Sequence, residues 1–212
     1  MRRLAGLAIS AAAATVGLGA LPAGAQGTAA PGSYAQRYAS LCAACHGANG
    51  RSDMPGVPAL AGQHSFYAIT QLFLFRQGRR ANEAMTAIAK TMTDQDMRGF
   101  SDYIGTLPYV PPPKPAAPPD ATRMARGQAL AQEHKCLMCH GADLSGGQQV
   151  ARIGAQKEDY LRMTLQEYKS GKRPGYTIAM GEAVSRIPPE DLDTIAYFVA
   201  NFQEAPPKPA GK

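Results

Sequence analysis

Two short segments of the chain hold residue types suited to metal and redox chemistry. Each has the pattern Cys-x-x-Cys-His, and together they use all four cysteines: Cys42-Ala43-Ala44-Cys45-His46 and Cys136-Leu137-Met138-Cys139-His140. This pattern is typical of covalent haem attachment. Residues three apart share one face of a helical turn. Both thiols of a segment can therefore bond to one porphyrin, while the following histidine turns to the iron. The sequence predicts two haem c groups, with thioether residues Cys42, Cys45, Cys136 and Cys139 and iron ligands His46 and His140.

Two other kinds of site could use the same residues. Zinc usually takes four protein ligands, and each half of the chain offers two cysteines and one nearby histidine. A zinc site built from all four cysteines would leave both histidines unexplained. Disulfides or redox dithiols would not need a histidine after each second cysteine. The doubled motif therefore favours haem over both alternatives.

The first 25 residues have the features of a signal peptide. Arg2 and Arg3 form a basic start, residues 4–21 are apolar and uncharged, and Ala23-Gly24-Ala25 is a cleavage pattern. An uncleaved membrane anchor is the alternative, but the run is rich in alanine and glycine and short for a span. We expect export to the periplasm, cleavage before Gln26, and a mature protein that is at most peripheral to the membrane.

The charge of the chain bears on its partners. The formal net charge is +6, and Arg2 and Arg3 of the predicted signal peptide supply two of the positive charges. The ionised propionates of two haems would offset more of it. Nucleic-acid-binding proteins usually present a strongly basic face, so we expect no nucleic-acid partner.

The residues around the two motifs also repeat, which predicts two tandem units. We expect an N-terminal domain over residues 26–107 and a C-terminal domain over 121–203. Residues 108–120 between them are dominated by proline and favour an extended, semi-rigid linker. Residues 204–212 are similar and predicted to be disordered. A small domain has little core of its own, and a haem would supply the missing apolar centre.

Each unit shows the same order of helical signals. A short helix precedes the motif, a loop ending in Ala-Gly-Gln or Gly-Ala-Gln follows it, then an amphipathic helix ends at a glycine, and a last helix follows a capping signal. The expected helices cover 34–41 and 123–133, then 65–77 and 158–170, and finally the segments after 93–96 and 188–191. No convincing alternating β pattern is present. The sequence therefore predicts an all-α fold.

Methionine is the candidate for the second axial ligand of each iron. A Met/His pair raises the reduction potential of a haem, because the soft thioether favours Fe(II). Met85 follows His46 by 39 residues, and Met180 follows His140 by 40. Both methionines also precede a matched acid, Asp96 or Asp191, by 11 residues. The repeat therefore selects Met85 and Met180.

Other side chains compete for the axial position. Met92 is the main rival in the first unit, but it aligns with Ile187, so core packing explains it. His64 and His134 are the remaining histidines, and a ligand role for either would break the repeat. We expect surface or helix-end roles for both.

A basic residue follows the middle helix of each unit, Arg80 in the first and Arg173 in the second. A guanidinium group pairs well with a carboxylate, so both arginines are candidate partners of haem propionates. The alternative is a cation near a helix C-terminus that interacts with the helix dipole. The sequence does not separate the two roles.

The ordered set of motifs extends beyond the haem segments. It comprises Cys-Ala-Ala-Cys-His-Gly (42–47), Pro-Ala-Leu-Ala-Gly-Gln (58–63), Gln71-Leu72 with Phe75 and Gly78-Arg79-Arg80, and Met85 before Thr93-Asp94-Gln95-Asp96, with a looser copy in the second half. This set resembles the cytochrome c4 family of dihaem class I c-type cytochromes, over nearly all of the mature chain. The resemblance implies two cytochrome c folds packed about a pseudo-twofold axis, with haem propionate edges facing each other. It also implies periplasmic electron transfer, often toward a terminal oxidase. The chain departs from the family in its proline-rich linker and in Arg-Ile-Gly-Ala-Gln at 152–156.

Three functions fit these features. The leading one is a carrier of single electrons between redox proteins such as a terminal oxidase, cytochrome bc1 or a dehydrogenase. The alternative is the cytochrome subunit of a periplasmic dehydrogenase complex, of the flavocytochrome or alcohol dehydrogenase type, which a stable partner would reveal. The third is a dihaem enzyme, which needs an open iron position. Met85 and Met180 argue against that position, so we expect an electron-transfer protein rather than an enzyme.

Overall fold

The computed structural model describes most of the chain, namely residues 32–110, 117–173, 175 and 177–203. Within these residues the regular elements are helices, with a single isolated β-bridge between Gly147 and Val150 and no strand. The all-α prediction is therefore confirmed. The predicted signal peptide, the centre of the linker and the predicted disordered tail lie outside the described residues.

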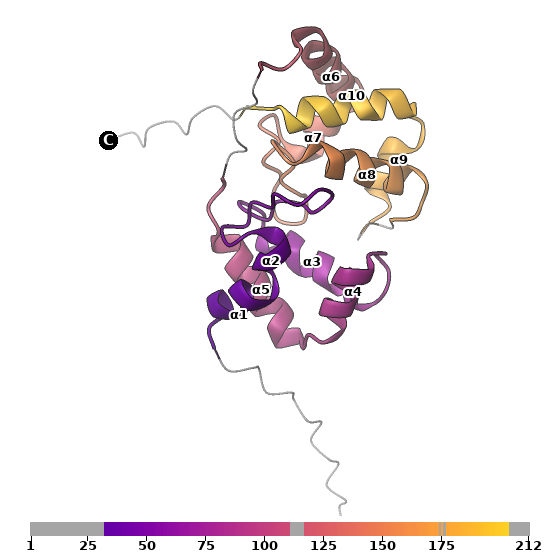
Figure 1. The fold of residues 1–212 in the computed structure, drawn as a ribbon. Helices are drawn as coiled ribbons and strands as arrows, with labels where there is room; N and C mark the ends of the chain where they lie inside the picture. Colours follow the sequence, from indigo (N-terminus) through magenta and orange to yellow (C-terminus); the bar gives the residue numbers. More distant parts are fainter. Residues whose placement is uncertain (1–31, 111–116, 174, 176, 204–212) are drawn as a thin grey trace, which may run out of the picture.

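The described residues form ten helices in two groups, which are stacked on each other in Figure 1. The N-terminal group consists of α1 (Tyr34–Leu41), α2 (Ala43–His46), α3 (Ser65–Arg76), α4 (Glu83–Lys90) and α5 (Asp94–Thr106). The C-terminal group consists of α6 (Ala121–Glu133), α7 (Cys136–His140), α8 (Glu158–Lys169), α9 (Ala179–Ser185) and α10 (Pro189–Ala200). The order of helices is the same in both groups, as the repeat predicts.

Each group has its own hydrophobic core. In the first, α5 packs on α1 and α3, and α4 packs on α3, around buried residues that include Tyr38, Leu72 and Phe100. In the second, α10 packs on α6 and α8, and α9 packs on α8, around buried residues that include Leu130 and Leu192. The predicted apolar faces of the last helices therefore point inward in both units.

Local side chains set several helix ends where the sequence predicts them. Thr93 caps α5, and its hydroxyl accepts a hydrogen bond from the Asp96 amide at 3.1 Å. Gly78 and Gly171 follow α3 and α8 with φ of 65° and 73°, the left-handed backbone that glycine allows. Helix α6 begins two residues before the predicted start, because Asp120 caps it and accepts from the Arg123 amide at 2.7 Å.

Two short helices are absent from the sequence prediction. They are α4, which contains Met85, and α9, which contains Met180. Asn82 begins α4, and its side chain accepts a hydrogen bond from the Met85 amide at 2.9 Å. An asparagine before Glu83 is a usable helix-start signal. Helices of eight and seven residues carry too few apolar repeats for periodicity to reveal them.

The loops between the haem motifs and the middle helices, 47–64 and 141–157, share a pair of main-chain hydrogen bonds, although the second loop is one residue shorter. The Gly50 carbonyl accepts from the amides of Leu60 and Ala61, and the Leu144 carbonyl accepts from those of Ile153 and Gly154. The sequence departure at 152–156 therefore preserves the loop. It places Ala155 at φ 55°, where the first unit has Gly62 at φ 72°.

This difference predicts opposite effects of exchanging the two residues. Ala155→Gly removes the strain of a left-handed alanine, which exceeds the entropy that glycine adds to the unfolded chain, so we expect a gain of about 0.5–1 kcal/mol in the free energy of unfolding. Gly62→Ala should cost at least about 1 kcal/mol, since the new Cβ would lie 2.9 Å from Cβ of Tyr109. Denaturant titration of the haem-loaded protein measures both. A loss of stability in Ala155→Gly would contradict this account.

Candidate haem-binding sites

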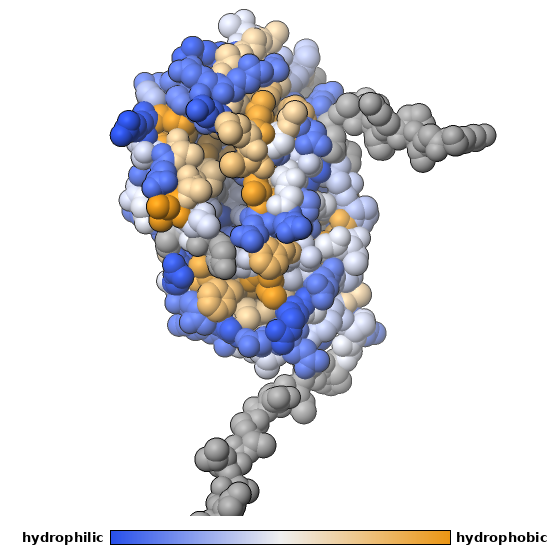
Figure 2. All heavy atoms as spheres, turned by 180° about the vertical axis from the view of Figure 1, so that it is seen from behind, coloured by the Kyte–Doolittle hydropathy of each residue, from blue (hydrophilic) through white to orange (hydrophobic). Residues whose placement is uncertain are grey.

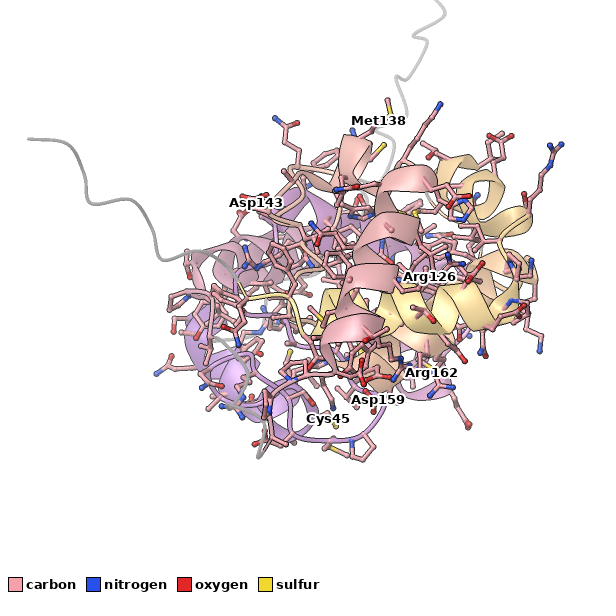
Figure 3. All side chains as sticks on the ribbon, turned by 90° about the horizontal axis from the view of Figure 1, so that it is seen from above. Cys45, Arg126, Met138, Asp143, Asp159 and Arg162 are labelled. Atoms are coloured by element: carbon pink, nitrogen blue, oxygen red, sulfur yellow. The ribbon has the colours of Figure 1, made fainter. Side chains whose placement is uncertain are left out.

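Helices α2 and α7 present the four cysteines in pairs. In each pair the first thiol packs against the core of its unit and the second is exposed: Cys42 with Cys45, and Cys136 with Cys139. All four are free thiols. Burial raises the pKa of Cys42 to about 11 and also raises that of Cys136. Met138, between the cysteines of α7, projects from the surface in Figure 3. Each pair thus lies at the edge of a core, where thioether bonds could join a cofactor to the chain.

The two predicted axial histidines are buried and held in the same way. The Nδ1 atom of His46 donates a hydrogen bond to the Pro58 carbonyl at 3.0 Å, and that of His140 donates to the Ala151 carbonyl at 2.9 Å. This bond fixes the ring and leaves Nε2 as the lone-pair donor for a metal. Burial also lowers the pKa of both imidazoles, which favours the neutral form that binds iron.

The methionines selected from the repeat occupy equivalent places. Met85 on α4 and Met180 on α9 are both half-buried and pack against the core of their own unit. The rival, Met92, is 7% exposed and belongs to the first core, and its counterpart Ile187 is 2% exposed in the second core. The structure thus gives Met92 the same packing environment as an isoleucine.

Arg80 and Arg173 lie at the interface between the two units. Arg80 donates to the side-chain oxygen of Gln71 at 2.7 Å and to the Tyr160 hydroxyl of the other unit at 2.8 Å. Arg173 donates to Thr164 at 3.0 Å and to the Tyr67 hydroxyl of the other unit at 3.3 Å. Both arginines are buried. Tyr67 and Tyr160 are the third residues of α3 and α8, and each accepts a hydrogen bond from the arginine of the opposite unit, a contact that the sequence does not reveal.

This cluster contains more positive than negative charge. The one carboxylate within ion-pair distance of either guanidinium is Glu167, 3.8 Å from Arg173, as far as the described residues show. Among these residues Arg173 Nε is buried without a hydrogen-bond partner. Burial alone would raise the pKa of Tyr160, yet the two cations lower it to about 8. The interface can therefore accept additional anionic groups.

These observations fit haem c. Each unit offers a pair of thiols, a buried histidine with a free Nε2 and a methionine on a separate helix, and the units share buried cations suited to propionates. On the face shown in Figure 2, hydrophobic side chains gather on both units. In the C-terminal unit, the surface is hollowed among these side chains. The described ranges contain no group of three or more His, Cys, Asp and Glu side chains placed to hold a metal ion, which the zinc alternative requires.

Comparison with known proteins agrees with this arrangement. The family model described as Cytochrome c matches residues 34–108 and 124–203. Cytochrome c4 of Thiocapsa roseopersicina is 33% identical over 175 residues, covering 77% of this chain and 88% of the relative. This chain belongs to the cytochrome c4 family. A protein of Thiomonas intermedia (strain K12) named thiosulfate dehydrogenase electron acceptor is 30% identical over 86% of this chain and 88% of its own length.

The fold agrees with a solved member of the family. The crystal structure of reduced recombinant cytochrome c4 from Pseudomonas stutzeri superposes with a TM-score of 0.71, at 22% identity, over 80% of this chain and 97% of that chain. The prediction of two tandem cytochrome c-like helical domains is confirmed. As a member of this family, the chain is an electron-transfer protein with covalently bound haem c. Within the part of the chain that the structure describes, no helix combines the length and apolarity needed to span a bilayer.

The shared position of Tyr160 between two cations generates a stability prediction. Tyr160→Phe removes an acceptor that Arg80 and Arg173 both use, so it should destabilise the haem-loaded protein by about 2 kcal/mol. The matched variant Tyr67→Phe removes one longer bond from Arg173 and should cost about 1 kcal/mol or less. Equilibrium unfolding in denaturant compares them. Equal effects of the two variants would contradict the central place given to Tyr160.

Proposed function

We propose that this member of the cytochrome c4 family is a periplasmic protein that carries single electrons between respiratory partners through two His/Met haems. The observation that carries the proposal is the repeated donor set, a carbonyl-oriented histidine and a half-buried methionine in each unit. Two protein ligands leave an iron no position for substrate. We therefore propose an electron carrier and not an enzyme.

The ligand assignment follows from that donor set. We assign thioether bonds to Cys42 with Cys45 and to Cys136 with Cys139. The iron ligands are His46 with Met85 in the first unit and His140 with Met180 in the second. The core position of Met92, shared with Ile187, supports the choice of Met85. The proposed domains remain 26–107 and 121–203, joined by 108–120.

Each side chain has a distinct role in this proposal. The bound haem supplies a one-electron Fe(III)/Fe(II) couple. His46 and His140 keep fixed ring orientations through their bonds to carbonyls, and Met85 and Met180 raise the reduction potential. Arg80 and Arg173 pair with propionates. Their burial at the interface, with Glu167 as the one carboxylate nearby among the described residues, supports this role over that of a helix-end cation.

The partner proposal draws on the relatives. A terminal oxidase or cytochrome bc1 remains a candidate partner, and a dehydrogenase is favoured as a donor because the Thiomonas intermedia relative is named as the electron acceptor of one. The alternative function, a permanent cytochrome subunit of a dehydrogenase complex, uses the same haem chemistry. Co-purification with a flavin- or quinone-containing subunit through size exclusion would favour that alternative.

The methionine-to-iron charge-transfer band of the oxidised protein tests the ligands. We expect Met85→Ala to remove about half of the band and Met180→Ala the other half, because each thioether binds one of two irons. Met92→Leu is the matched control and should leave the band intact, since it replaces one apolar core side chain by another.

Absorption spectra of the same proteins could also contradict the proposed ligands. An unchanged band in Met85→Ala would transfer the ligand role to Met92. A high-spin haem in the unmodified protein would favour the enzyme interpretation.

Processing of the N-terminus tests the localisation. We expect the haem-loaded protein in the periplasmic fraction, with a mass that fits a chain beginning at Gln26 plus two haems, because residues 1–25 have the pattern of a cleaved signal peptide. Intact-mass spectrometry after cell fractionation measures this. A full-length chain in the membrane fraction would instead indicate an uncleaved anchor.

A further inference from the structure

A buried glutamine from each unit forms two hydrogen bonds with the main chain of the other unit. Gln156 Nε2 donates to the Ala59 carbonyl at 2.9 Å, and Gln156 Oε1 accepts from the Ala59 amide at 2.9 Å. In the equivalent contact of the other unit, Gln63 Nε2 donates to the Arg152 carbonyl at 3.1 Å, and Gln63 Oε1 accepts from the Arg152 amide at 3.0 Å. Both glutamines are at most 9% exposed. Each amide group therefore pairs with a backbone peptide as one strand pairs with another.

The residues bonded by the glutamines lie next to the carbonyls that orient the axial histidines. Ala59 directly follows Pro58, whose carbonyl accepts from His46. Arg152 directly follows Ala151, whose carbonyl accepts from His140. Each glutamine thus holds the loop that positions the histidine of the opposite unit.

The glutamines are themselves fixed in place. Gln63 Oε1 also accepts from the His64 amide at 3.1 Å, and Gln156 Oε1 from the Lys157 amide at 3.0 Å, so neither amide group can rotate without losing bonds. The residue before each glutamine is bonded to the C-terminal end of the last helix of its own unit. The Gly62 amide donates to the carbonyl of Leu107, which directly follows α5, and the Ala155 amide donates to that of Val199 in α10, both at 2.9 Å. Each glutamine is therefore held in position by its own unit while it bonds to the other.

We propose that Gln156 is a positioning residue for the N-terminal haem and Gln63 for the C-terminal haem, so that each domain sets the reduction potential of the haem in the other. This inference rests on the axial roles of His46 and His140 in the proposed function. A hydrogen bond from Nδ1 to a carbonyl makes the imidazole a stronger donor, which stabilises Fe(III). Loss of a glutamine frees the loop, weakens that bond and raises the potential of the opposite haem.

Two matched variants test the crossed relationship. Gln156→Met and Gln63→Met keep side-chain length, remove both bonds to the other unit, and serve as controls for each other. Each is measured in the haem-loaded protein by spectroelectrochemistry, in an otherwise native chain and in a Met85→His background. Replacing methionine by histidine lowers the potential of a His/Met haem, and this shift identifies the N-terminal haem.

A second readout is the solvent exchange of the histidine Nδ1 proton, followed by NMR in the reduced protein. In Gln156→Met we expect a higher potential for the N-terminal haem than in the native chain and faster exchange at His46 than at His140. Gln63→Met should give the reverse. Should either variant fail to fold, Gln156→Asn and Gln63→Asn keep a neutral amide with a shorter reach that weakens the bonds to the other unit, and the same crossed pattern is expected at reduced size.

Three results would overturn the inference. The first is an equal shift in the reduction potentials of both haems, which would indicate general loosening of the interface. The second is a shift confined to the haem of the mutated unit. The third is unchanged potentials together with unchanged proton exchange. If Met85→His leaves both potentials unaltered, the ligand assignment under the proposed function fails instead. The exchange rates at His46 and His140 then decide the inference by themselves.

Discussion

The hydrogen bond between a histidine Nδ1 atom and a main-chain carbonyl is the constraint on which both sites depend. His46 donates to Pro58, and His140 donates to Ala151, from short helices that alone could not fix a ring. The bond sets the tautomer and points Nε2 away from the loop, while burial lowers the pKa of the imidazole and favours its neutral form. Everything that holds these loops, including their own hydrogen bonds to Gly50 and Leu144, therefore also shapes the proposed iron sites.

The interface joins the two similar units through reciprocal hydrogen bonds. Its contacts are reciprocal, as in an isologous dimer, although both partners belong to one chain. Each glutamine side chain forms hydrogen bonds with the main chain of the other unit. Each buried arginine donates a hydrogen bond to a tyrosine of the other unit. Most acceptors of the two arginines are neutral oxygens, and a buried cation without a matching anion is costly. This supports the proposal that haem propionates lie at the interface. In the proposed account, the same surface links the two haem sites and receives the negative charge of the propionates.

Much of this structure could be predicted from residues that act locally. The two Cys-x-x-Cys-His motifs, the threonine cap of α5 and the glycines after α3 and α8 specify their surroundings within a few positions. The spacing repeat also selected Met85 and Met180 without the helices that hold them, because α4 and α9 are too short for periodicity. The partners of Arg80, Tyr160 and the glutamines lie far away in sequence, so only the packing of the two units reveals them. The retained loop at 152–156 shows that a changed sequence can keep a backbone at some cost in strain at Ala155.

The central claim is that both irons are closed, each between a carbonyl-held histidine and a methionine. Quantitative electron paramagnetic resonance of the fully oxidised, haem-loaded protein tests it most directly. The account predicts low-spin ferric signals that integrate to both haems of the chain, with no high-spin component. A high-spin signal equal to one haem would contradict it, because one iron would then have an open or weakly held position.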